Sequence, residues 1–307
     1  MAYNRHHILR TAAILSLVLG LTGCHEGVLA PEGPISEQER LILFDSLAVM
    51  LAIVIPTILA TLGFAWWFRA SNKRAKYLPE WSYSGKVELL VWSIPALVIL
   101  FLGGIAWFSS HDLDPSQPLT SKEKPLEIEV VSLDWKWLFI YPEQHVASIN
   151  RLVVPAGMPL HFYITSASVF NDFFVPQLGS QIYAMGGMAT QLNLKADKPG
   201  VYPGLSAHFS GDGFSDMYFN VEAVPAAKFT AWVATAKTQG RVLSETEYRS
   251  LLVQSHNVKP YTYRDVAPGL FTDVVMQKLP EGEGPKEGRP APEVTPKSTQ
   301  APSGKED

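Results

Sequence analysis

The sequence contains a single cysteine, Cys24, among its 307 residues. No disulfide can therefore form within the chain, and no pair of thiolates is available to hold a metal. The net charge is −4, and no block of lysine and arginine follows residue 110, so nothing favours nucleic-acid binding. Catalytic triads, phosphate-binding loops and dinucleotide fingerprints are absent as well, and we expect no catalysis by this chain alone. The histidines after residue 110 have no spacing typical of a zinc or copper site; they are His111, His145, His161, His208 and His256.

Apolar residues are unevenly distributed along the chain. Hydrophobic residues make up 47% of the whole. About the first 110 residues contain three long apolar runs, whereas the remainder has the mixed composition of a soluble domain and ends in a polar tail. The sequence therefore predicts a membrane-associated part followed by a folded domain.

Residues 1–23 have the pattern of a processed segment. A basic head precedes an apolar core, Ile14 to Leu21, that is too short to span a bilayer. The core ends in Leu-Thr-Gly-Cys, the pattern of a bacterial lipoprotein signal that is cleaved before the cysteine. We therefore predict a lipid on the thiol of Cys24; the alternative is an unmodified cysteine in a signal-anchor helix. One lipid alone anchors a protein weakly, so it would supplement the helices that follow.

Two later apolar runs are long enough to cross a membrane. The first, residues 41–68, exceeds a hydrocarbon core of ~30 Å at about 1.5 Å per residue, and the second covers residues 87–109. The connector 69–86 is rich in lysine and arginine, which by the positive-inside rule places it in the cytoplasm. The N-terminal segment 24–40 and everything after the second span then face the periplasm.

A β-rich domain is predicted over residues 126–224, after a Pro/Ser/Lys linker at 110–125. Short runs with strand-like alternation recur about every ten residues and are separated by turn signals, which is typical of a β-sandwich or barrel. An aromatic cluster alternates along one strand, and we interpret it as a packed sheet face: Trp135, Trp137, Phe139 and Tyr141. The predicted strands are Leu126 to Val131, Lys136 to Tyr141, Arg151 to Val154, Leu160 to Thr165, Gln191 to Leu194 and Met217 to Val221.

The pattern becomes helical over residues 225–279. An amphipathic stripe closed by Gly240 predicts one helix; it consists of Phe229, Trp232, Val233 and Ala236. Ser244 and Glu247 form a capping box for a second helix through about Val253. Residues 280–307 contain almost no apolar side chains, so we predict a disordered tail.

One Gly- and Ser-rich loop has the form of a metal-binding loop with few of the ligands. It is YPGLSAHFSGDGFSDM, Tyr202 to Met217, and it is accompanied by SVFNDFFVP, Ser168 to Pro176. It resembles the copper loop of subunit II of the haem–copper oxidases, which in cytochrome c-oxidising members runs roughly G-x-C-S-E-x-C-G-x-x-H-x-x-M, with an earlier histidine. On this alignment Ser206 and Ser210 stand at the cysteine positions, His208 at the glutamate, Phe214 at the loop histidine and Asn171 at the earlier histidine; only Met217 is retained. Soft sulfur ligands hold copper where hydroxyls do not, so the resemblance implies a loop kept without its metal.

The resemblance extends over about residues 20 to 276 and is specific for subunit II of the cytochrome o-type ubiquinol oxidases. It rests on VVSLDWKWLFIYPEQ (Val130 to Gln144), LGSQIYAMGGM (Leu178 to Met188) and HFSGDGFSDM (His208 to Met217). It implies two transmembrane helices followed by a periplasmic cupredoxin-like β-sandwich with a small C-terminal helical extension, in the bacterial inner membrane.

The function that the resemblance implies is that of a non-catalytic subunit of a proton-pumping ubiquinol oxidase of the aerobic respiratory chain. Such a subunit would support assembly and cap the haem-bearing subunit I. No cofactor is expected in this chain; the haems and one copper would lie in subunit I, and subunits III and IV would be further partners.

Glu88 is a candidate for a proton pathway. It lies where the second apolar run enters the membrane from the cytoplasm, and ionisable groups there are costly unless they face protein or water. The alternative is an interfacial carboxylate paired with Lys86. The segment KVELLVWSIP resembles the family segment at the mouth of a proton pathway into subunit I.

Two rival functions remain open from the residues alone. A copper-bearing subunit II of a cytochrome c oxidase would need the missing cysteines and histidines. A free membrane lipoprotein with a binding module would not need membrane helices rich in small residues, which favour helix partners.

Overall fold

The computed structural model describes residues 27–284, which divide into two units. One unit comprises residues 37–114 and contains two long helices; the other comprises the remaining described residues, 27–36 and 115–284. The predicted signal segment, Cys24 and residues 285–307 of the predicted tail lie outside the described residues.

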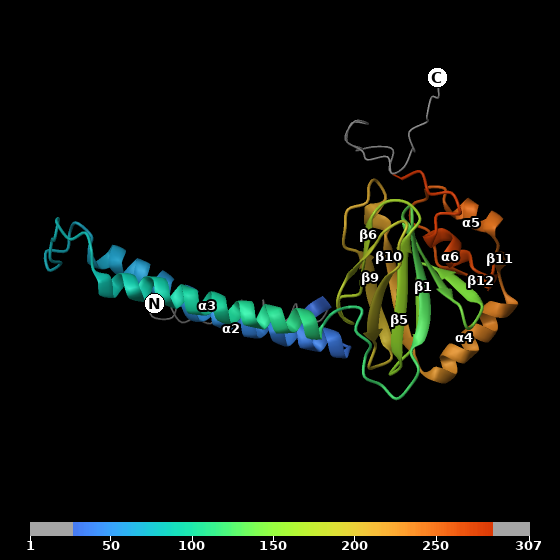
Figure 1. Ribbon diagram of the computed structural model, residues 1–307, viewed down its shortest axis with the longest axis horizontal. Helices are drawn as coiled ribbons and strands as arrows, with labels where there is room; N and C mark the ends of the chain where they lie inside the picture. Colours follow the sequence, from blue (N-terminus) through green and yellow to red (C-terminus); the bar gives the residue numbers. More distant parts are fainter. Residues whose placement is uncertain (1–26, 285–307) are drawn as a thin grey trace, which may run out of the picture. The chain divides into compact units, whose positions relative to one another are not determined.

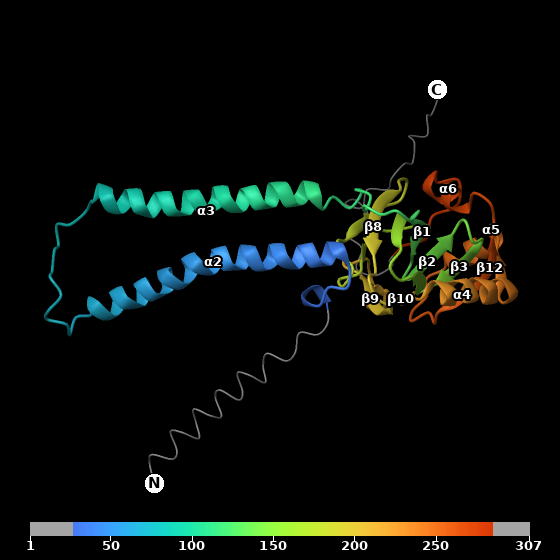
Figure 2. The same ribbon diagram turned by 90° about the horizontal axis from the view of Figure 1, so that it is seen from below.

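Two helices correspond to the predicted membrane spans. They are α2 (Pro34–Trp67) and α3 (Gly85–Asp112), joined by the connector 68–84 (Figure 2). Both are long and apolar enough to cross a membrane, with a hydropathy of 2.4, and no part of either apolar window is buried. Helix α2 begins before the predicted span because Pro34 suits the first turn of a helix, where hydropathy gives no signal.

The β unit consists of two sheets packed face to face (Figure 1). The seven-stranded sheet has the order β11-β12-β3-β2-β1-β5-β8, and the five-stranded sheet has the order β4-β10-β9-β6-β7. Their strands are β1 (Leu126–Leu133), β2 (Lys136–Tyr141), β3 (Val146–Ile149), β4 (Arg151–Pro155), β5 (Pro159–Ser166), β6 (Asn171–Phe174), β7 (Ile182–Ala184), β8 (Thr190–Lys195), β9 (Gly200–Ser206), β10 (Tyr218–Val224), β11 (Arg241–Leu243) and β12 (Tyr261–Val266).

Each of the six predicted strand segments overlaps a strand of the structure, but several strands were not predicted. Strand β9 contains Pro203 between two glycines, a composition that indicates a turn rather than a strand. Strands β6 and β7 are too short for an alternating pattern to stand out.

Strand β2 is buried along its whole length because both faces of its sheet are covered. The predicted aromatic face, from Trp135 to Tyr141, is buried in the core between the sheets. The intervening Leu138 and Ile140 point into a second apolar cluster together with side chains of the C-terminal helices. A strand buried on both faces reads as a continuous apolar run, which is what the sequence has here.

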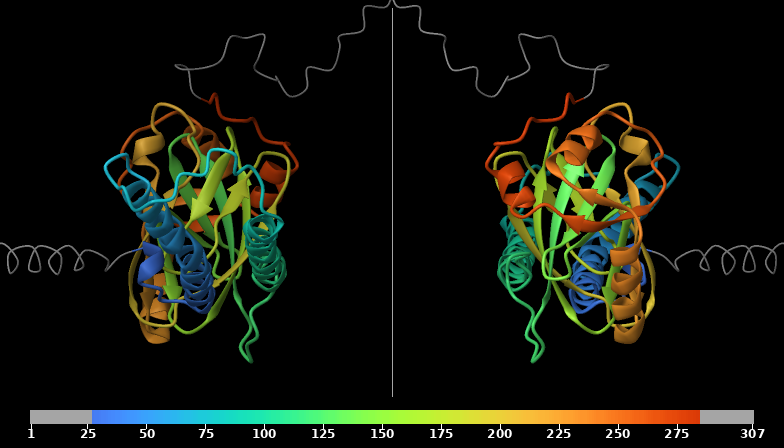
Figure 3. Two further views of the ribbon diagram at one scale, coloured as in Figure 1. Left: turned by 90° about the vertical axis from the view of Figure 1, so that its left-hand side faces the viewer. Right: turned by 90° about the vertical axis from the view of Figure 1, so that its right-hand side faces the viewer.

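The segment after β10 is not purely helical, which corrects the prediction for residues 225–279. It contains α4 (Ala226–Thr238), α5 (Glu245–Leu251) and α6 (Leu270–Val275), together with β11 and β12, which extend the seven-stranded sheet through β3. Figure 3 shows the helices, orange to red, at the periphery of the sandwich. The predicted stripe of α4 packs on the core, and the hydroxyl of Ser244 caps α5 by accepting from the amide of Glu247 at 3.2 Å. We call residues 225–284 the C-terminal extension.

The first residues of the predicted tail are also attached to the β unit, so a disordered tail cannot begin at residue 280. The amide of Gly282 donates to the carbonyl of Ala167 at 2.7 Å, and the amide of Gly284 donates to Oδ2 of Asp134 at 2.9 Å.

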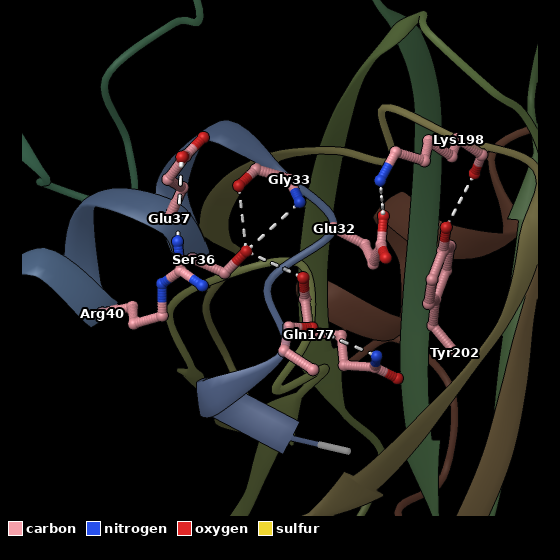
Figure 4. A network of polar contacts seen from close by, with 9 residues as sticks. Glu32, Gly33, Ser36, Glu37, Arg40, Gln177, Lys198 and Tyr202 are labelled. Atoms are coloured by element: carbon pink, nitrogen blue, oxygen red, sulfur yellow. Dashed lines mark hydrogen bonds and ion pairs between the residues drawn. The ribbon is translucent and has the colours of Figure 1, made fainter. Parts of the chain in front are cut away.

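The segment 27–36, before the apolar part of α2, is part of the β unit. Figure 4 shows its contacts with the loop that follows β6. The carbonyl of Gln177 accepts hydrogen bonds from Oγ of Ser36 at 2.7 Å and from the amide of Glu32 at 2.7 Å. Lys198 forms an ion pair with Glu32 at 3.1 Å. We call residues 27–36 the N-terminal strap.

The strap fits closely because Gly33 has no side chain. A Cβ at this position would lie 2.4 Å from the carbonyl oxygen of Lys195 and 2.9 Å from that of Leu178. Lys195 ends strand β8, so its carbonyl oxygen cannot move away without disturbing that strand, and only glycine allows this approach.

Candidate functional site

The loop 207–217 connects β9 to β10, and β6 lies beside β9 in the same sheet (Figure 1). This arrangement brings together Asn171, at the start of β6, and Ser206, at the end of β9. The Ser206 hydroxyl donates to Oδ1 of Asn171 at 2.9 Å, and both side chains are 2% exposed. Two positions that the resemblance assigns to lost copper ligands therefore form a buried hydrogen-bonded pair.

Ser210 and Met217 form a second pair in the same loop. The Ser210 hydroxyl lies 3.4 Å from Sδ of Met217, and both residues are buried. The amide of Ser206 donates to the carbonyl of Met217 at 3.1 Å, which connects the two pairs through the backbone. The structure thus gathers four of the six residues that the resemblance aligns with the copper site: Asn171, Ser206, Ser210 and Met217.

The other two predicted site residues lie toward the outside. Phe214 is half-buried in a short 3-10 helix (Phe214–Asp216). The centroid of its ring lies 5.6 Å from that of Phe209. His208 is exposed, and its ring packs edge-on against Phe170 at 4.9 Å. At the glutamate position of the resemblance, the chain therefore presents an imidazole to the surface.

Asp172 is an ionisable group beside the site that the sequence did not single out. It is 3% exposed, and its Oδ1 has no hydrogen-bond partner within the described residues. Burial raises the pKa of its carboxyl to about 6, and the nearby His208 partly offsets this. The feature of the sequence that could have identified Asp172 is its position next to Asn171.

The donors gathered here do not fit a dinuclear copper centre. Such a centre needs bridging thiolates and imidazole nitrogens, whereas the loop offers two hydroxyls, an amide and one thioether. The Ser206 hydroxyl is already committed to Asn171. Within residues 27–284, no group of three or more His, Cys, Asp or Glu side chains is placed to hold a metal ion.

Glu88 lies in the first turn of α3, apart from this loop in the sequence and in a different unit. It is exposed, and its amide donates to the carbonyl of Ser84 at 3.0 Å. Among the ion pairs of the described residues, none joins Glu88 to Lys86.

The chain is similar to several known proteins. Residues 124–224 match the family described as the periplasmic domain of cytochrome c oxidase subunit II. Ubiquinol oxidase subunit 2 of Acetobacter aceti is 49% identical over 265 residues, which are 86% of this chain and 86% of that protein. Cytochrome bo(3) ubiquinol oxidase subunit 2 of Pseudomonas aeruginosa is 45% identical over 88% of this chain and 81% of its own length. The subunit of the same name from Pseudomonas putida is 44% identical over 90% of this chain and 87% of its own length.

These similarities cover the helices and the β unit together, not the β-sandwich alone. They support a quinol-oxidising complex over the cytochrome c-oxidising alternative, in agreement with the ligands that the loop lacks. The chain belongs to the family of subunit 2 of the ubiquinol oxidases.

Proposed function

We propose that this chain is a subunit without a redox centre of its own, which supports assembly of a proton-pumping ubiquinol oxidase and caps its haem-bearing subunit I. The observation that supports this is that the residues aligned with copper ligands in the resemblance carry hydroxyl and amide groups, and these groups form contacts within the chain: Ser206 with Asn171, and Ser210 with Met217. Electrons would therefore pass from ubiquinol to haems and copper in subunit I without crossing this chain. Subunits III and IV would complete the complex.

Helices α2 and α3 would pack against subunit I in the membrane. Their apolar side chains are not covered by any part of the described chain, as is typical of helices that face lipid or other helices. A Cβ added at Gly103 or Gly104 would meet no atom within 4 Å. Such open small-residue surfaces let a second helix approach closely.

The topology proposed for the membrane follows from where the chain leaves the two helices. The strap before α2 is bonded to the β unit through Gln177, and Pro115, just after α3, accepts from the amide of Asn193 at 2.9 Å. The chain therefore leaves the β unit directly before the apolar part of α2 and returns to it directly after α3, so these two helix ends would face the same side of the membrane as the β unit, the periplasm. The basic connector 68–84 would then be cytoplasmic.

Purification of the complex through a tag on this chain tests the function. After mild detergent extraction, we expect a haem protein to co-purify and the preparation to oxidise ubiquinol with oxygen uptake. A chain recovered alone, without haem, would instead support the free lipoprotein alternative. Copper bound to the isolated chain would support the cytochrome c oxidase alternative.

A lipid on Cys24 would add a further membrane attachment. Replacing Cys24 with serine should abolish incorporation of radioactive palmitate, because the acylated N-terminus forms only on a cysteine. The protein should remain in the membrane fraction, since two apolar helices anchor it far more strongly than one lipid. Equal label in the variant and the wild type would contradict lipidation at this residue.

A further inference from the structure

The turn between β1 and β2 has a strained backbone and lies entirely inside the protein. Trp135 has a φ of +65°, a left-handed conformation that bulky residues rarely adopt and that persists only where the surroundings enforce it. Asp134, Trp135 and Lys136 are each at most 3% exposed. We call these three consecutive residues the Asp-Trp-Lys turn; each of them contacts a segment distant in the sequence.

Trp135 contacts the loop 207–217 and the C-terminal extension at once. Its Nε1 donates to the carbonyl of Ser210 at 3.4 Å. Gly213 lies against the indole so closely that an added Cβ would be 2.3 Å from the ring. The imidazole of His256 stacks on the same indole, with ring centroids 4.9 Å apart and an interplanar angle of 27°. Nδ1 of His256 also reaches Oδ2 of Asp216 in the loop at 3.2 Å.

The residues on either side of Trp135 hold the extension in place. Nζ of Lys136 donates to the carbonyl of Val253 at 2.9 Å and to the hydroxyl of Ser255 at 2.6 Å. Burial lowers the pKa of Lys136 to about 8, and the negative charge of Asp134 partly offsets this by raising it. Asp134 in turn accepts from the amide of Gly284. The extension is thus fixed on both sides of the stacked histidine.

The loop 207–217 has few long-range backbone hydrogen bonds of its own. The amides of Phe214 and Asp216 donate to carbonyls only three residues back, those of Gly211 and Gly213. Local bonds of this kind shape a turn but do not fix its place on the protein. In a copper-bearing loop, the bonds from the ligands to the metal would hold the loop in place. The hydroxyl, amide and thioether groups found here do not form a copper site that could do so.

We propose that the C-terminal extension acts as a brace for the loop 207–217, with His256 as the positioning residue that contacts it across Trp135. The match to the periplasmic domain of cytochrome c oxidase subunit II ends at residue 224, so the brace lies outside the matched region. It would keep the loop in one conformation where metal ligands no longer do. This inference does not depend on the partner subunits, because every contact lies within the β unit.

Hydrogen exchange of the full chain in its purified complex tests the brace. In His256→Ala, we expect the loop amides, such as that of Asp216, to exchange about five-fold faster, which corresponds to ~1 kcal/mol. Amides of β5, which lies between β1 and β8 in the seven-stranded sheet, should not change. His256→Phe keeps an aromatic ring over Trp135 and should return most of the protection. Lys259→Ala is the matched control, because Lys259 is exposed in the same segment.

Two results would overturn the proposal. One is unchanged exchange of the loop amides in His256→Ala with the complex intact. The other is an equal acceleration in Lys259→Ala, which would mean that the segment responds to any substitution. Circular dichroism of each variant establishes that the fold is retained, since His256 is mostly exposed and its loss leaves the core untouched.

Discussion

Restoring five side chains around the loop 207–217 is expected to turn a colourless domain into a purple one that binds about two copper ions. The geometry favours this outcome because three of the five positions, together with Met217, already lie close together, whereas His208 and Phe214 stand further out in the same loop. Oγ of Ser206 lies 2.9 Å from Oδ1 of Asn171, and Oγ of Ser210 lies 3.4 Å from Sδ of Met217. Exchange of a hydroxyl for a thiol changes the volume little. The substitutions are Ser206→Cys, Ser210→Cys, Asn171→His, Phe214→His and His208→Glu.

The measurement is visible absorbance together with the copper content, after reduction of the two new thiols and loading with copper. A variant with Ser206→Ala and Ser210→Ala in place of the two cysteine substitutions is the matched control, because without a thiolate neither bridge can form and no thiolate–copper absorption arises. It should stay colourless. A folded quintuple variant that takes up no copper would show that these residues do not stand at the ligand positions.

Replacing Glu88 with glutamine should lower quinol-driven oxygen uptake, normalised to haem, by roughly three- to ten-fold. A group that transfers protons directly at a reaction centre contributes ~100-fold or more to the rate. The expected loss is smaller here because protons from water can enter the pathway by other routes when one group at the membrane surface is missing. An amide cannot release and regain a proton, whereas the size and helix propensity of the side chain barely change. The subunit should remain in the complex, since Glu88 is exposed and makes no ion pair among the described residues.

A purely structural role for Glu88 predicts a different result. An acidic residue in the first turn of α3 stabilises the helix by only ~0.3–1 kcal/mol, so its loss would leave turnover unchanged. The comparison is made from about pH 6 to about pH 9, where proton supply to a carboxylate matters. Glu80→Gln in the connector serves as the control for loss of a nearby charge. Equal turnover in Glu88→Gln and wild type would return Glu88 to this structural role.

Local patterns in the sequence were sufficient for the helices and for much of the sandwich. The apolar runs that became α2 and α3 are long and uninterrupted, and hydropathy is a property of a segment alone. Alternation or enrichment in β-branched and aromatic residues located β1, β2, β4, β5, β8 and β10 for the same reason. The absence of cysteine and histidine at the positions that the resemblance aligns with copper ligands was also visible, because the identity of a side chain such as Ser206 does not depend on the fold.

The contacts between distant segments required the tertiary structure. Residues 241–243 and 261–266 lack a strong strand pattern, and they became β11 and β12 because β3 offers a free edge to β12. The N-terminal strap joins the β unit because Gly33 fits against backbone atoms far along the chain.

The sequence by itself determined the two long apolar helices, about half of the strands and the identity of the side chains around the loop 207–217. Only the tertiary structure decided that Asn171 bonds Ser206 and that His256 stacks on Trp135. The reason is physical: propensity and periodicity act over a few neighbouring residues. The packing of a side chain depends instead on which distant surfaces the whole chain brings against it.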